Sequence, residues 1–233
     1  MASDKELRLL ELSTKFDILY DNIMSNTAPG LNEYEKSVLL TEALNMVVLS
    51  YCRGDNTHSD TFEKTEEVRK YLSPLVTTTL CDEDTTEALE GLSENSKFFN
   101  LPEDLLFITY EQATLKSTAD KCLDGKKVLV FPVEQDDYWY MSQNPFKKVS
   151  DNRAFRLNVS DNKVEIIAKD VVDKYLIRYI RKPNPIILID LGDDLSIEGK
   201  HEASICELDP ILDQEILNTA VSLAMASRTI SNN

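Results

Sequence analysis

Hydrophobic side chains recur at spacings of three and four residues over the first part of the chain, which is the period of an amphipathic helix. The pattern runs from Leu9 to Ile23 and stops before the turn-rich residues 26–30. Ser3 and Glu6 stand three residues apart ahead of it, the spacing of a capping box that satisfies free backbone N–H groups at a helix start. These residues predict a first helix that begins near residue 3.

Two further helices are expected before residue 73. Asn32 and Glu35 repeat the capping-box spacing and predict the start of a second helix, which ends near Gly54. A third, shorter helix is expected from Asp60 to about Tyr71. The proline that follows limits its length, because proline cannot continue a helix.

Between residues 75 and 208 the spacing changes to two, and β-branched and aromatic residues become common, which favours strands. Asp161 and Asn162 separate two such runs and predict a hairpin turn. Residues 82–96 are acidic and are expected to form a surface excursion. The predicted strands are 76–80, 105–115, 127–132, 155–159, 164–168 and 175–182.

The end of the chain has sharply marked boundaries. Pro183 and Pro185 cannot donate to a sheet ladder, so they end the strand before them, and the run 186–191 (IILIDL) predicts a further short strand. Asp209 followed by Pro210 predicts a helix start, because the carboxylate can cap free N–H groups and proline at the first helical position loses no hydrogen bond. The helix is expected to bury the face that carries Leu212, Ile216, Ala220 and Leu223.

These elements predict an α+β fold: an N-terminal helical bundle completed by the C-terminal helix, with a β-rich middle region. The expected boundaries are 1–73 plus 209–233 for the helical bundle and 74–208 for the β-rich region, in effectively one compact subunit. A chain of 233 residues is long enough to bury a core of this kind.

Composition and charge narrow the classes of function. The formal net charge of −16 argues against a surface that grips phosphates. It is compatible with a wall along which DNA slides, and equally with simple solubility, so charge alone leaves both open. No apolar run approaches the roughly 20 residues that span a bilayer, and the charged start is unlike a signal peptide. The widely spaced cysteines favour buried or half-buried thiols over zinc ligands: Cys52, Cys81, Cys122 and Cys206.

Few residue patterns in the sequence indicate catalysis or the binding of a cofactor or metal ion. His58 and His201 stand in polar loops without a second ligand at metal spacing, and six glycines leave no phosphate-binding loop. The sequence therefore predicts no catalytic, cofactor or metal-binding residues, and a protein that is not an enzyme. Two acidic clusters could hold magnesium for nuclease chemistry, although solvated loops are the favoured interpretation: Glu134, Asp136 and Asp137, and Asp190, Asp193 and Asp194.

Two segments are candidates for contact with other proteins. The segment 137–148 is rich in aromatic residues and holds Trp139 and Phe146; it is either a loop that covers the core or a contact surface, because aromatic residues are enriched at interfaces. Arg178, Arg181 and Lys182 form the main basic patch, which in an acidic protein can pair with an acidic neighbour, including another copy of the chain.

Three separated motifs resemble head-to-tail connector, or neck ring, proteins of tailed phages, closest to the crAss-like phages of Bacteroidales. The first is LNEYEKSVLLT at 31–41, and the second is NPFKK at 144–148. The third is RYIRKPNPIIL at 178–188, followed by CELDP at 206–210. The resemblance extends over about 31–228, and the acidic residues 82–96 match it least.

The resemblance implies a virion structural protein, made in the host cytoplasm, that has no catalytic residues. Such proteins assemble below the portal protein as a ring, usually of twelve copies, with further neck and tail proteins. They extend the portal channel, retain the packaged DNA that passes through it without specific binding, and join capsid to tail. No membrane is involved.

A closed ring needs two different complementary patches on one subunit. The basic stretch 178–182 is one candidate, with the acidic stretch 82–90 or 190–194 as its partner. Two other classes of function stay open at this point. They are a monomeric adaptor in the cytoplasm and an enzyme with a carboxylate metal site.

Overall fold

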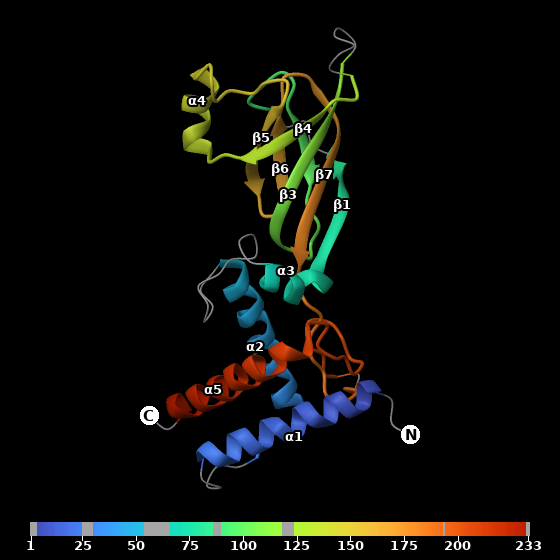
Figure 1. Cartoon of the computed structure of the whole chain (residues 1–233), viewed down its shortest axis with the longest axis vertical. Helices are drawn as coiled ribbons and strands as arrows, with labels where there is room; N and C mark the ends of the chain where they lie inside the picture. Colours follow the sequence, from blue (N-terminus) through green and yellow to red (C-terminus); the bar gives the residue numbers. More distant parts are fainter. Residues whose placement is uncertain are drawn as a thin grey trace. The chain divides into compact units, whose positions relative to one another are not determined.

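The computed structural model describes residues 4–24, 30–53, 66–85, 90–117, 124–192 and 194–231. The chain divides into two compact units (Figure 1). The helical unit comprises Met1–Leu75 and Lys182–Asn233, and the barrel unit comprises Val76–Arg181. Some predictions concern residues that lie outside the described ranges. These residues are Ser3, Gly54, His58, Asp60, Cys122 and Asp193.

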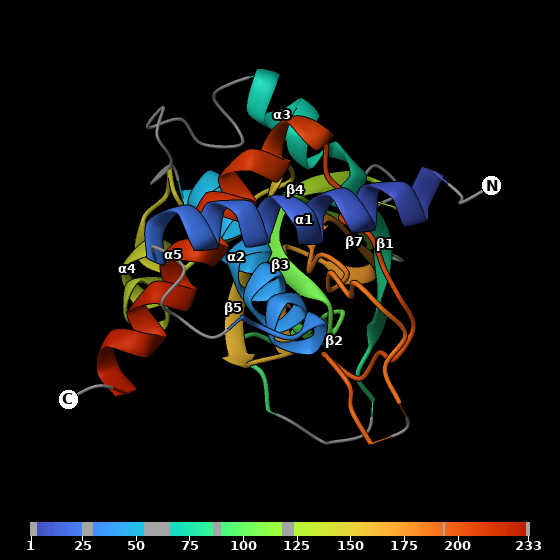
Figure 2. The same cartoon turned by 90° about the horizontal axis from the view of Figure 1, so that it is seen from below.

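The helical unit places the last helix of the chain against the first two. Helix α5 contacts both α2 and α1, as Figures 1 and 2 show from two sides. Leu212, Ile216 and Ala220 of this last segment are buried as expected, whereas Leu223 is half-buried. The elements are α1 (Asp4–Met24), α2 (Glu33–Arg53), α3 (Glu66–Leu72), the 3-10 turns η1 (Ser73–Leu75) and η2 (Pro210–Leu212), and α5 (Asp213–Ser231).

Two predicted helix starts are confirmed by their hydrogen bonds. Asn32 Oδ1 accepts from the backbone N–H of Glu35 at 2.8 Å, and the Glu35 carboxylate accepts from the N–H of Asn32 at 2.9 Å. This is the reciprocal geometry of a capping box. At the other end of the chain, Asp209 Oδ1 accepts from the N–H of Ile211 at 3.1 Å, with Pro210 in the first turn.

The strand predicted at 186–191 is wrong, because its backbone bonds to helix side chains instead of a sheet. The N–H of Ile186 donates to Thr41 Oγ1 at 3.1 Å, and the N–H of Leu188 donates to Ser37 Oγ at 3.0 Å. Ile187 forms only an isolated bridge with Ser204. The segment is therefore fixed on α2 in the helical unit, together with the rest of 182–208.

The barrel unit is a closed seven-stranded barrel in the order β1-β2-β6-β5-β4-β3-β7, with β1 paired to β7. The pairs are antiparallel except β4 with β5, which is parallel. Buried residues alternate with exposed ones along β4, as expected for a strand with one face toward a core. The strands are β1 (Val76–Glu83), β2 (Lys97–Asn100), β3 (Leu105–Lys116), β4 (Lys127–Pro132), β5 (Arg153–Ser160), β6 (Lys163–Ile167) and β7 (Val171–Arg181).

The interior of the barrel is lined by hydrophobic side chains from every strand, with Cys81 as the contribution of β1. Phe99 and Tyr175 of this interior meet with ring centroids 5.4 Å apart. A charged group is buried beside them: Glu111 accepts a hydrogen bond from the Tyr175 hydroxyl at 2.6 Å, and Arg156 Nε lies 3.4 Å from the same carboxylate. The apolar interior of the barrel therefore also holds a buried acid, Glu111, which is partnered by Tyr175 and Arg156.

The predicted fold class is wrong. In place of a β-rich region between helices, the middle of the chain is a closed barrel, and α4 (Gln135–Gln143) lies within the barrel unit. Period-two patterns predict single strands but not their partners, and closure depends on pairs such as Val76 with Ile180 that are far apart in sequence. The predicted hairpin at Asp161 and Asn162 is confirmed, since β5 and β6 flank it.

Candidate subunit interfaces

The described residues offer no constellation for metal chemistry. Among them, no group of three or more His, Cys, Asp or Glu side chains is placed to hold a metal ion. Of the acidic candidates, Glu134 and Asp136 are exposed at the start of α4, and Asp190 accepts a hydrogen bond from the N–H of Ala203 at 2.7 Å. His201 is exposed, with Nδ1 2.7 Å from the carbonyl oxygen of Leu195. No helix in the described ranges is long and apolar enough to cross a membrane.

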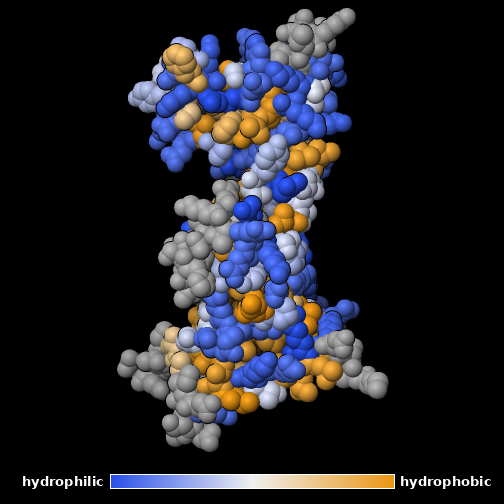
Figure 3. All heavy atoms as spheres, viewed as in Figure 1, coloured by the Kyte–Doolittle hydropathy of each residue, from blue (hydrophilic) through white to orange (hydrophobic). Residues whose placement is uncertain are grey.

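The aromatic segment forms helix α4 and has two faces. One face covers a small core cluster, where Tyr138 meets Phe155 edge-on with centroids 6.4 Å apart. The other face points to solvent: Trp139 is 67% exposed, Tyr140 75% and Phe146, in the following turn, 91%. We call Trp139, Tyr140 and Phe146 the α4 aromatic patch. Figure 3 shows hydrophobic residues on the surface of the barrel unit beside α4.

The turn that carries Phe146 is held in place by hydrogen bonds. Asn144 Oδ1 accepts from the N–H of Phe146 at 2.9 Å. Arg153 Nη1 donates to the carbonyl oxygens of Phe146 at 3.2 Å and Lys147 at 3.1 Å, and its guanidinium lies 5.3 Å from the centre of the Phe131 ring. Phe146 is therefore presented to solvent by an anchored turn, which lowers the entropy cost of using it in a contact.

Strand β7, which carries Arg178 and Arg181, lies on a different side of the barrel unit from helix α4. In Figure 1, α4 lies beside β5, and β7 with β1 lies at the opposite side of the barrel. Arg178 is exposed on β7, and its Nε donates to Thr78 Oγ1 of β1 at 3.3 Å. Arg181 ends the strand half-buried, and Lys182 follows it exposed. The structure thus separates the predicted contact residues into two surfaces.

The comparisons with known proteins decide the family. The model of the phage tail ring protein 3/4 family matches residues 7–233. Ring protein 3 of Bacteroides phage crAss001 is 44% identical over 220 residues, which cover 94% of this chain and 95% of the relative. Ring protein 4/5 of the same phage is 34% identical over 226 residues, 93% of this chain and 92% of the relative.

The chain belongs to the phage tail ring protein 3/4 family. The resemblance to a ring protein of crAss-like phages is confirmed, and the range of the family match, residues 7–233, spans the acidic residues 82–96 that the motifs match least. A phage tail ring protein is a structural component of the virion, and the family is not one of enzymes. Oligomeric assembly into a ring with other phage tail proteins follows from the same family name.

In this ring protein, part of the acidic stretch 82–90 is already paired within the subunit. Lys163 Nζ lies 2.6 Å from the carboxylate of Asp84, which is almost fully buried, and Lys97 Nζ lies 2.8 Å from that of Glu83. Asp82 is exposed at the end of β1. The acidic charge that this stretch presents to a neighbour is therefore smaller than the sequence suggests.

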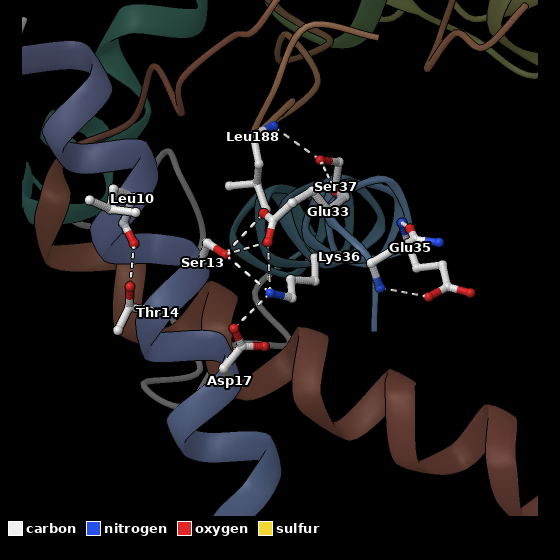
Figure 4. A network of polar contacts seen from close by, with 10 residues as sticks. Leu10, Ser13, Thr14, Asp17, Glu33, Glu35, Lys36, Ser37 and Leu188 are labelled. Atoms are coloured by element: carbon white, nitrogen blue, oxygen red, sulfur yellow. Dashed lines mark hydrogen bonds and ion pairs between the residues drawn. The ribbon is translucent and has the colours of Figure 1, made fainter. Parts of the chain in front are cut away.

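The helical unit of the ring protein is fixed by a buried lysine that the sequence analysis missed. Figure 4 shows Lys36 Nζ of α2 between Asp17 of α1 at 2.7 Å, Glu33 at 2.9 Å and Ser13 at 3.2 Å. Burial alone would lower the pKa of Lys36, but the hydrogen bonds with the Asp17 and Glu33 carboxylates outweigh it and raise the pKa. The signal was present, because Lys36 shares the helical face of Leu40, which is fully buried.

Proposed function

We propose that this chain is a neck ring of the virion, below the portal protein, that extends the portal channel, retains the packaged DNA and joins capsid to tail. The ring contains twelve copies, is made in the host cytoplasm, and contacts further neck and tail proteins. The observation that carries the proposal is the family match over residues 7–233, which identifies a phage tail ring protein.

The charge of the chain supports a passive role toward DNA. At a net charge of −16 the subunit repels phosphates, and a channel wall with this property lets DNA slide without holding it to a sequence. Retention then comes from closing the channel with the neighbouring rings and not from affinity for DNA.

The contacts that build the ring are proposed at the two surfaces described above. The α4 aromatic patch is large, rigid and exposed, which are the properties of residues that dominate interface energies. The basic residues Arg178, Arg181 and Lys182 supply the second surface, with the exposed acidic residues of 82–90 or 190–194 on a neighbour as partners.

Electron microscopy of purified virions, with density resolved to the subunit, tests the proposal. We expect twelve copies of this fold in one layer of the neck, around a lumen wide enough for duplex DNA, with the α4 aromatic patch buried between subunits or between rings. Absence of the chain from the neck would contradict the proposed function. A neck ring in which Trp139 and Phe146 face solvent would contradict the proposed interface only.

A further inference from the structure

Two strand edges of the barrel unit carry no backbone partner among the described residues. Strand β1 pairs with β2 only through Asp82 and Glu83, so the outer edge of 76–81 has none of the described strands beside it. Strand β3 pairs with β4 only from Gln112 to Thr114, so the outer edge of 105–111 is likewise without a strand. In the described part of the chain, no backbone hydrogen bond is recorded from either outer edge to another strand.

These two edges belong to one small sheet. Where β1 is not paired with β2 and β3 is not paired with β4, both strands still pair with β7. The three strands there form a ribbon with β7 in the middle (Figure 1). Both outer strands are antiparallel to β7, so β1 and β3 run in the same direction. The ribbon therefore has one open edge on each side, and the two strands that carry these edges are parallel to each other.

The β1 edge lacks the features that proteins use to blunt an open strand. Residues 76–81 read VTTTLC, with no charged residue and no proline. Such an edge pairs readily with another strand unless it is protected. By contrast, the unpaired end of β5 is capped within the subunit, since Val133 N–H donates to the Arg156 carbonyl at 2.9 Å and Gln135 Nε2 donates to the Asn158 carbonyl at 2.9 Å.

Exposed hydrophobic side chains gather on the same ribbon. Leu80 of β1 is 55% exposed, and Phe107 and Tyr110 of β3 are 38% and 40% exposed. Two bulges on β3 leave Leu106 and Thr109 out of register with β7. Bulges bend and twist a strand, and a sheet that continues around a ring needs such curvature at each repeat.

We infer that the outer edge of β3 in one subunit pairs with the outer edge of β1 in the next copy of this chain, so that the ribbons join into one continuous sheet around the ring. This inference rests on the proposed ring. In a ring of many copies, neighbours are related by a small rotation, so β1 of the next copy keeps its direction and the new pair is parallel. One heterologous contact of this kind satisfies both edges of every subunit and leaves none open.

Photocrosslinking within assembled rings tests the pairing. A photoreactive amino acid replaces Leu80, and rings are assembled from a mixture of isotopically light and heavy subunits. Crosslinks between two copies can then be recognised by their mixed mass. We expect crosslinks from position 80 to residues 105–111 of another copy. Crosslinks from position 80 to a different segment, to a different virion protein, or within one subunit only would overturn the inference.

A matched pair of substitutions gives a second readout. Leu80→Lys places a charge on the open edge, whereas Leu129→Lys places it on β4, where Leu129 is 46% exposed and pairs with Gln112 on one side and Arg153 on the other. We expect loss of the ring with Leu80→Lys and an intact ring with Leu129→Lys, while both variants keep the circular dichroism of the parent. An intact ring with Leu80→Lys overturns the pairing; absence of any ring from the parent virion instead contradicts the proposed function.

Discussion

The side chain of Lys36 is almost completely buried, and its ion pairs with Asp17 and Glu33 offset the free-energy cost of burying its charge. Breaking a buried ion pair leaves charged partners without compensation, but Asp17 and Glu33 are themselves 46% and 34% exposed and can recover water. We therefore expect Lys36→Met to lower the free energy of unfolding by about 1–3 kcal/mol in urea denaturation. Lys15→Met, which removes an exposed pair with Glu11, should cost less than about 0.5 kcal/mol. Equal losses in the two variants would contradict this account.

The contribution of Glu111 to the stability of the barrel falls as pH rises, whereas the contribution of most acidic groups increases. Burial raises the pKa of Glu111, and the attraction of Arg156 and the hydrogen bond from Tyr175 do not offset it. Because the folded-state pKa lies above the unfolded one, the stabilisation from the neutral acid is complete below the unfolded pKa and is lost as pH rises through the folded value. Relative to the parent, Glu111→Gln should gain stability as pH rises from about 4 to 7. Parallel stability curves in urea titrations at a series of pH values would contradict this.

At the scale of elements, the helical unit depends on two hydroxyl groups of α2. Ser37 and Thr41 accept the backbone N–H groups of Leu188 and Ile186, which are buried. Removing an acceptor leaves a buried donor without a partner, at about 1–3 kcal/mol each. We expect Ser37→Ala with Thr41→Val to destabilise the chain by about 2–5 kcal/mol in urea denaturation.

The control for that pair is Ser50→Ala. The hydroxyl of Ser50 donates to the Val47 carbonyl within α2 and makes no hydrogen bond to another segment among the described residues, so its removal should cost less than about 0.5 kcal/mol. In hydrogen exchange, the amides of Ile186 and Leu188 should lose protection in the double variant while the amides of β7 keep theirs. Unchanged protection at 186 and 188 would show that the hydroxyls do not hold the segment.

The elements that were predicted correctly are those whose cause is local. The capping box at Asn32 and Glu35 and the start at Asp209 need only neighbouring residues, so the sequence contains the whole interaction. The segment 186–191 has the apolar composition of a strand, but its hydrogen-bond partners lie about 150 residues earlier in α2, and no local pattern reveals them. Helix α4 was missed because its aromatic residues have weak helix propensity.

The candidate interface was predictable only in part, for a similar reason. Aromatic and basic residues stand out in an acidic sequence, and the structure exposes Trp139, Phe146 and Arg178. The open edges of β1 and β3 could not be found in this way, because an edge is defined by the strand that is missing beside it. Only the pairing order of the barrel shows which strand edges have no neighbouring strand in the described part of the chain.

At the scale of the whole molecule, assembly brings together many copies that each carry a net charge of −16. Repulsion between such copies acts at long range and is screened by salt, since the Debye length falls from about 30 Å at 0.01 M to about 8 Å at 0.15 M. A local contact between a basic patch and an acidic neighbour acts at short range and is screened less when it is partly buried. The two effects can be separated by two charge reversals of equal size.

Arg178→Glu with Arg181→Glu changes the net charge by the same amount as Arg69→Glu with Lys70→Glu, two exposed positions on α3. If the basic patch of β7 contacts an acidic neighbour, the first variant should fail to form rings at both 0.01 M and 0.15 M salt. The second should fail only at low salt, because added repulsion is its only defect. Native mass spectrometry and electron microscopy measure the ring fraction. Rescue of both variants by salt would show that net repulsion alone governs assembly and that the patch makes no specific contact.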